Sequence, residues 1–178
     1  MGCSFQVVIA ITVSLALTGC SFAQRMIPGS TMSNSEVLGL LNTINRSEID
    51  AGQLAKQKGS TQEVRTFASR MVNEHQMMMQ NLNHLAQRMS VQPQKPALAS
   101  TLEDAHQETM ETLRNKAGSD FDKGYITYQI KMHEQAVDLV KEAGDSADNP
   151  HLHLYLRETN PDLKTHLIAA QAVGRQTQ

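Results

Sequence analysis

The stretch VRTFASRMVNEHQMMMQNLNHLAQRM, residues 64–89, decides the fold of this chain. Together with His75, its apolar positions are separated by alternating steps of four and three residues, and they are Val64, Ala68, Met71, Met78, Leu82, Leu85 and Met89. This spacing is typical of one buried face of an amphipathic helix. His75 stands on the same stripe, so the pattern predicts an imidazole that points into the protein core.

Three other segments carry the same stepping, and in each of them one titratable residue stands at a core position. These residues are Glu48 within residues 37–55, His133 within residues 126–140 and His166 within residues 152–173. A buried carboxylate is costly to leave unpaired, and a buried imidazole needs partners for both ring nitrogens. We therefore predict that Glu48, His75, His133 and His166 meet one another, a proton or a metal ion inside a helical bundle.

Capping signals divide the chain into helices. Ser/Thr-x-x-Glu patterns, single capping residues, prolines and glycines together predict helices over residues 33–58, 60–90, 100–117, 119–144 and 149–174. The capping boxes are expected at Ser33, Ser60 and Ser100, while Ser119 and Asn149 cap the last two helices. Strand-like alternation is missing from the sequence, so the predicted class is all-α.

The lengths of these segments also predict a topology. Gly59 leaves so short a break that the first two helices must pack antiparallel. The helix predicted over residues 100–117 would be about 27 Å long, enough to carry the chain back along the bundle as a crossover. The helices over residues 60–90 and 119–144 then run in the same direction. This is the arrangement of a ferritin-like four-helix bundle with an additional crossover helix.

The N-terminus has the features of a targeting segment. Residues 7–17 are almost wholly apolar and are followed by Thr18-Gly19-Cys20, which with Leu17 resembles the lipobox of bacterial lipoproteins. We predict a signal peptide over residues 1–19, a lipid on Cys20, a tether over residues 20–32 and one bundle domain over residues 33–174. A rival cleavage after Ala23 would release a soluble protein instead.

The predicted lipid sets the expected location and partners. An acylated Cys20 would attach the chain to a membrane on the periplasmic side of a bacterial envelope, with the outer membrane favoured. Under the rival cleavage the protein would be soluble in the periplasm or secreted. A net charge of −2 and only seven aromatic residues offer neither a basic field nor a stacking platform, so nucleic-acid binding is not expected. The sequence identifies no protein partner.

Three local signatures indicate a family. They are VRTFASRMVNEH at residues 64–75, FDKGY at residues 121–125 before His133, and PDLKTH at residues 161–166. With Glu48 in the first helix, they resemble an uncharacterised family of ferritin-like bacterial envelope proteins, a domain of unknown function often labelled "predicted outer membrane protein". The resemblance implies a four-helix ferritin-like fold in the envelope and leaves the chemistry open.

The four polar core positions suit one ion better than two. A di-iron bundle usually supplies Glu-x-x-His from two helices, but the residues three before the histidines here are Val72, Ile130 and Leu163. Three imidazoles and a carboxylate instead suit a single divalent ion such as zinc, copper, nickel or iron. The alternatives are a metal-free structural or interaction module and, more weakly, an oxidoreductase with an open mononuclear site. A nucleophilic or phosphate-binding motif is missing, so catalysis is not favoured.

The remaining glutamates, histidines and methionines are not expected to be ligands. Glu74 and Glu134 lie off the stripes and are expected to be solvated or to support a histidine from outside the site. The other histidines are expected at the surface, and they are His84, His106, His151 and His153. The methionines at positions 71, 77, 78, 79, 89 and 132 could suggest copper(I) ligation by thioethers, but methionines at stripe spacing usually fill core gaps, and only some of these six can face one point.

Overall fold

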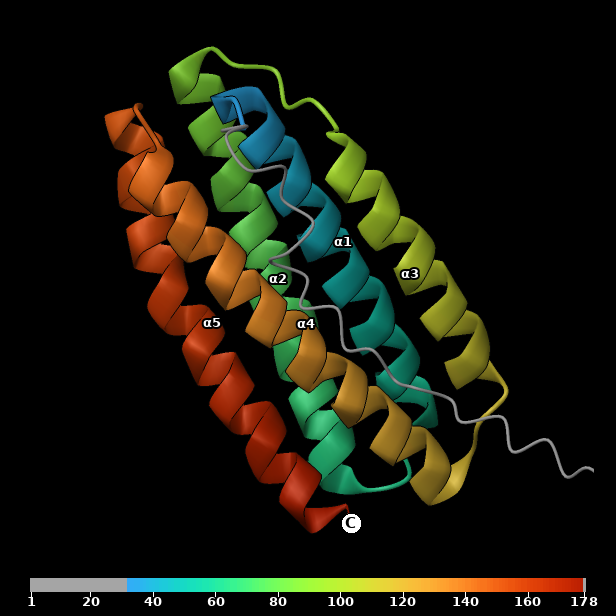
Figure 1. Ribbon diagram of the computed structural model, residues 1–178. Coiled ribbons are helices and arrows are strands. Elements are labelled where there is room, and N and C mark those ends of the chain that lie inside the picture. Colours follow the sequence, from blue (N-terminus) through green and yellow to red (C-terminus); the bar gives the residue numbers. More distant parts are fainter. Residues whose placement is uncertain (1–31, 178) are drawn as a thin grey trace, which may run out of the picture.

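The computed structural model describes residues 32–177, which form five helices (Figure 1). They are α1 (Asn34–Lys58), α2 (Gln62–Met89), α3 (Ala97–Arg114), α4 (Gly118–Ser146) and α5 (Pro150–Gln176). The all-α prediction is confirmed. None of these five helices combines the length and the hydropathy needed to cross a membrane. The predicted leader, Cys20 and nearly all of the tether lie outside the described residues.

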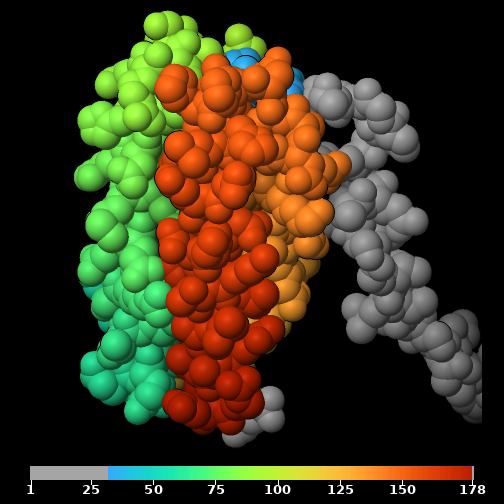
Figure 2. Space-filling view, turned by 90° about the vertical axis from the view of Figure 1, so that its left-hand side faces the viewer, coloured from blue at the N-terminus to red at the C-terminus, as the bar shows by residue number. Residues whose placement is uncertain are grey.

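The helices form two antiparallel hairpins, α1 with α2 and α4 with α5, and α3 connects them (Figure 1). α3 runs along the outside of α1 from one end of the bundle to the other, so α2 and α4 point in the same direction. The predicted ferritin-like bundle with a crossover helix is therefore confirmed. One face of the molecule shows α5 lying between α2 and α4 (Figure 2).

Two helices begin at the predicted caps. Ser33 and Glu36 form a complete capping box at the start of α1, with the Ser33 backbone N–H donating to Glu36 over 2.9 Å. At the start of α5, the Asn149 side chain accepts from the backbone N–H groups of His151 at 3.0 Å and Leu152 at 3.2 Å. These contacts satisfy donors that a helix leaves free in its first turn.

The start of α2 differs from the prediction because Asp122 of α4 binds the residues before it. The Asp122 carboxylate accepts from the Ser60 backbone N–H at 2.9 Å, the Ser60 hydroxyl at 2.5 Å and the Thr61 backbone N–H at 3.1 Å. Ser60 is thus occupied, and Thr61 becomes the N-cap by accepting from the Val64 N–H. Asp122, buried at the start of α4, ties the two hairpins together.

The predicted starts of α3 and α4 at Ser100 and Ser119 are wrong by a few residues. α3 already begins at Ala97, where the Pro96 carbonyl accepts from the Ala99 N–H at 3.0 Å. α4 begins at Gly118, whose φ of +56° favours glycine. α4 and α5 also run two residues past their predicted glycine ends, since a packed helix tolerates a glycine at a cost of about 1 kcal/mol.

The core consists of two apolar clusters, one toward each end of the bundle. The first contains Ile44, Leu82, Ala136 and Leu163, and the second contains Ala51, Met71, Met132 and Ala170. On each of the four long helices, the polar core residue lies between the members of these two clusters. Glu48, His75, His133 and His166 therefore occupy one buried polar layer that separates two apolar halves.

Candidate metal site

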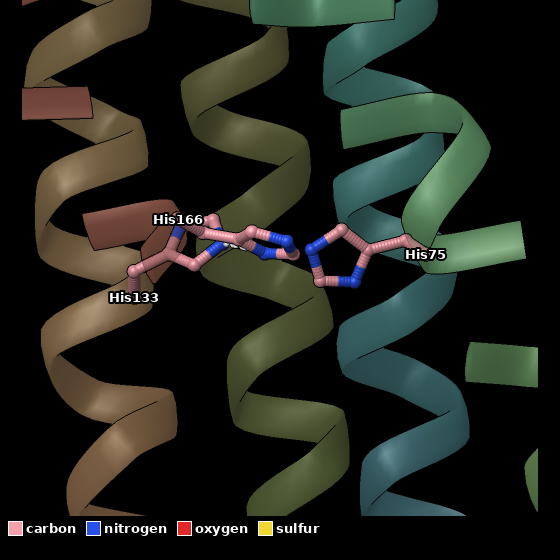
Figure 3. Close-up of side chains that lie close together, drawn as sticks. All are labelled: His75, His133 and His166. Atoms are coloured by element: carbon pink, nitrogen blue, oxygen red, sulfur yellow. Dashed lines mark hydrogen bonds between the residues drawn. The ribbon is translucent and has the colours of Figure 1, made fainter. Parts of the chain in front are cut away.

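Three of the predicted residues converge in the polar layer. His75 reaches it from α2 and faces His133 of α4 and His166 of α5 (Figure 3). The ring centroids are 5.2 to 5.6 Å apart, and one ligand atom from each ring lies within 4.8 Å of the other two. All three side chains are at most 1% exposed. Within residues 32–177, they form the group of side chains that can hold a metal ion.

Two of the rings are fixed by an acceptor on their outward side. His133 Nδ1 lies 2.9 Å from the Gln129 carbonyl oxygen, one helical turn earlier. A carbonyl oxygen can only accept, so this nitrogen carries the proton and Nε2 keeps a lone pair in the neutral ring. His75 Nδ1 lies 2.9 Å from the Asn45 side-chain oxygen of α1, which assigns the same tautomer to His75.

The third ring is fixed by a carboxylate. His166 Nε2 donates to Glu74 of α2, whose other oxygen accepts from Arg70 at 2.8 Å. Burial works to raise the pKa of Glu74, but the hydrogen bonds from Arg70 and His166 outweigh it and lower the pKa. Glu74 is thus ionised and accepts, so Nδ1 is the nitrogen of His166 that keeps a lone pair.

The remaining nitrogens of the three rings are the ones that face the site. His133 Nε2 and His166 Nδ1 lie 3.3 Å apart, and His75 Nε2 has no hydrogen-bond partner among the described residues. Burial and the neighbouring His133 lower the pKa of His166 to about 4, and burial lowers that of His75 well below its ordinary value. Protons are therefore disfavoured on these two rings, and their inward lone pairs lack a donor.

This donor set fits a metal ion. Zinc-bound imidazole nitrogens lie about 2.0 to 2.1 Å from the metal, which places them about 3.4 Å from one another in a tetrahedral site. The His133–His166 nitrogen distance of 3.3 Å is already at that value. Metal-binding histidines also usually donate their other N–H to a carbonyl or a carboxylate, as these rings do.

Glu48 is the predicted residue that the structure does not bring into this group. Its carboxyl is 1% exposed in the same layer, but it accepts from Gln129 Nε2 at 2.7 Å. Burial raises its pKa, with His133 and Gln129 opposing that change. The Gln129 amide therefore holds Glu48 beside the three rings. Its role as a ligand stays a prediction.

Asn45 and Gln129 were not predicted, although the sequence carries a signal for both. Asn45 lies three residues before Glu48, and Gln129 lies four residues before His133, so each shares a helix face with a predicted site residue. Both are buried polar side chains, at 5% and 0% exposure. Polar residues one turn away from an inward histidine are the pattern that would have found them.

His106 corrects the prediction that it lies at the surface. It is 4% exposed, and its two ring nitrogens contact the Tyr128 hydroxyl at 2.8 Å and Asp50 at 3.0 Å. These contacts join α3 to α4 and α1, because His106 lies on the inner face of the crossover helix. His106 lies outside the polar layer but is still buried, because α3 packs against α1 and α4.

The other secondary candidates lie as expected or nearly so. His84, His151 and Glu134 are exposed, and His153 is half-buried with its Nδ1 3.0 Å from the Gly144 carbonyl oxygen. Glu74 supports a histidine from outside the cluster, although that histidine is His166 rather than its neighbour in sequence. The methionines do not converge: those at 71 and 132 are buried, while Met77 is 55% exposed.

The fold and the site together define a ferritin-like helical bundle with a three-histidine polar core. The sequence matches a family described as a domain of unknown function, DUF4142, over residues 21–173, and the chain belongs to that family. No curated protein matches it. Its structure is similar to the crystal structure of a DUF305 fragment from Deinococcus radiodurans, with a TM-score of 0.67 at 14% identity over 82% of this chain and 99% of that one. At this identity the similarity supports the fold alone.

Proposed function

We propose that this protein binds one divalent transition-metal ion through His75, His133 and His166, and that it does so as an exported, lipid-anchored protein of the bacterial envelope. The observation that carries the metal proposal is the orientation of the rings. Each outward N–H is held by an acceptor on the protein, and three nitrogens converge without a hydrogen-bond donor among the described residues to satisfy them. A cation with three imidazole ligands satisfies all of them at once.

The chemistry of the donors limits the class of ion. Neutral imidazole nitrogens suit zinc, copper(II), nickel and iron(II), whereas magnesium and calcium require oxygen ligands. A doubly charged ion in a buried layer also needs a compensating negative charge. We propose that Glu48 supplies it as the fourth ligand, after exchanging its hydrogen bond from Gln129. A tetrahedral ion with four protein ligands would be structural rather than catalytic.

Metal titration of untagged protein tests the proposal. Protein stripped with a chelator is titrated separately with Zn²⁺, Cu²⁺, Ni²⁺ and, without oxygen, Fe²⁺, while calorimetry and elemental analysis report the stoichiometry. We expect one ion per chain, and we expect His75→Ala to lose it. His84→Ala, an exposed histidine of the same helix, is the matched control and should bind as the native chain does. Failure of all four ions to bind the native chain would overturn the proposal.

A second candidate is a metal-free structural or interaction module. The observation in its favour is that three contacts of the polar layer join different helices. They join α1 to α2 through Asn45 and His75, α4 to α5 through His133 and His166, and α5 to α2 through His166 and Glu74. Such a network can fix the register of a bundle without an ion. A chelator-treated chain with unchanged thermal stability and no metal affinity would support this reading.

A further inference from the structure

Glu74 stands next to His75 in the sequence but contacts a histidine of another helix. It lies on α2, and its carboxylate accepts from His166 Nε2 of α5. His166 is 1% exposed at its side chain, whereas Glu74 is 30% exposed. Glu74 therefore connects the buried ring to the seam between α2 and α5, which lies on the face shown in Figure 2.

The contact with Glu74 decides which nitrogen of His166 faces the site. A neutral imidazole carries one proton, and an ionised carboxylate can only accept, so the proton is held on Nε2. The other nitrogen, Nδ1, is the one that lies 3.3 Å from His133 Nε2. In the other tautomer a proton on Nδ1 would point into the cluster and would block that nitrogen as a ligand.

Arg70 holds the carboxylate in this position. Its Nε donates to Glu74 Oε1 over 2.8 Å, one turn earlier on α2, and leaves Oε2 for His166. Arg70 and Glu74 are 40% and 30% exposed, so the ion pair itself contributes little to stability. The hydrogen bond from His166, which is buried at the histidine, is the contact of Glu74 that affects the site.

We propose that Glu74 is the positioning residue of the metal site: it fixes the tautomer of His166 and so makes Nδ1 available as a ligand. This inference rests on the proposed function for its effect on metal affinity, but the tautomer itself is a property of the metal-free protein. A glutamine at position 74 would remove the constraint, because an amide can donate to Nε2 as well as accept from it. His166 would then populate both tautomers.

The first test is the ¹⁵N NMR spectrum of His166 in metal-free protein at pH 7.5. We expect the Nε2–H tautomer in the native chain and a mixture, or the Nδ1–H form, in Glu74→Gln. Glu134→Gln is the matched control, since Glu134 is also adjacent to a site histidine but is exposed. An Nδ1–H tautomer in the native chain, or an unchanged spectrum in Glu74→Gln, would overturn the inference even if no metal binds.

The second test is the metal affinity, with Zn²⁺ as the probe. We expect Glu74→Gln to weaken binding about 10- to 100-fold, the usual cost of losing such a supporting hydrogen bond. Arg70→Met should weaken binding less than Glu74→Gln does, because Glu74 loses one contact that holds it but keeps a carboxylate that accepts from His166. A native-like zinc affinity in Glu74→Gln would contradict the positioning role of Glu74 in metal binding.

Discussion

His133 Nε2 and His166 Nδ1 face each other across 3.3 Å, while the opposite nitrogen of each ring already contacts an acceptor. Two imidazole lone pairs at this distance need a cation between them, and the candidates are a proton and a metal ion. Burial and the proximity of His133 lower the pKa of His166 to about 4, which disfavours the proton at neutral pH. The His133–His166 pair is therefore the strongest structural support for the proposed metal ion.

The same pair predicts how the metal-free protein responds to acid. Unfolding returns His166 from a pKa of about 4 to about 6.5, so the unfolded chain binds more protons between these values. Stability should therefore be retained above pH 6.5 and fall as the pH drops toward 4, with His166 contributing up to roughly 3 kcal/mol. The buried His75 acts in the same direction. Urea unfolding at pH 7.5 and pH 5 measures the loss.

The variant His166→Gln separates the contribution of His166 to the pH dependence of stability from that of Glu48. Burial raises the pKa of Glu48, so its stabilising contribution is present below pH 4.5 and falls as the pH rises. Its pH dependence thus opposes that of the histidines. His166→Gln should lose less stability between pH 7.5 and pH 5 than the native chain. An equal pH dependence in both would contradict the lowered pKa of His166.

The Asp122 carboxylate should be needed for stability rather than for metal binding. It accepts three hydrogen bonds from Ser60 and Thr61, and it is 1% exposed. Asp122→Ala leaves these donors without their partner, and we expect a loss of about 3 kcal/mol in the free energy of unfolding. Asp120→Ala, which removes an exposed carboxylate two residues before Asp122, should change the free energy of unfolding by less than about 0.5 kcal/mol. Chemical denaturation measures both.

The contact between His106 and Tyr128 should hold the crossover helix on the bundle. Tyr128→Phe removes the hydroxyl that lies 2.8 Å from His106 Nδ1 and leaves a buried nitrogen without its partner. We expect a loss of about 1 to 3 kcal/mol and faster hydrogen exchange in α3. Tyr155→Phe, whose half-buried hydroxyl donates to the Met78 carbonyl over 3.2 Å, should leave exchange in α3 unchanged. Unchanged exchange in Tyr128→Phe would mean that apolar packing alone holds α3.

Two glycines should respond oppositely to alanine. A Cβ at Gly39 would meet the Gln94 carbonyl oxygen at 1.9 Å, where the segment before α3 crosses α1 and the Gln94 N–H donates to the Ser35 carbonyl over 2.9 Å. Gly39→Ala must displace that backbone, and we expect a loss of about 2 kcal/mol or more. At Gly144 the nearest atom is 3.6 Å away, so Gly144→Ala should be neutral or stabilising by up to about 1 kcal/mol. Thermal unfolding compares the two variants.

The membrane anchor is tested separately from the bundle. If the lipobox is used, the mature chain begins with an acylated Cys20, and Cys20→Ala abolishes both the acylation and membrane retention. Mass spectrometry of the mature N-terminus reports the modification, and membrane fractionation reports the retention. An unmodified chain that begins at Gln24 would contradict the lipoprotein proposal and would indicate the rival cleavage after Ala23.

The sequence by itself determined the class, the topology and the burial of Glu48, His75, His133 and His166. Helical periodicity places His75, His133 and His166 on inward faces, because a residue's position on a helix depends only on its own segment. The lengths of the breaks then fix which helices are antiparallel. Capping was less well determined: Ser60 carries a valid capping signal, but Asp122, distant in the sequence, binds it first.

Only the tertiary structure decided which hydrogen bonds form in the polar layer. Helical periodicity predicted Glu48 and the three histidines alike as residues of one site. In the structure the three rings converge, while Glu48 accepts a hydrogen bond from Gln129 of α4. The ring nitrogen that faces the site is set by Asn45, by the Gln129 carbonyl and by Glu74. A hydrogen bond depends on atoms brought within about 3 Å of each other, and most of these partners lie on different helices. The apolar periodicity of a sequence predicts which face of each helix is buried. The hydrogen bonds between helices form only once the helices have packed.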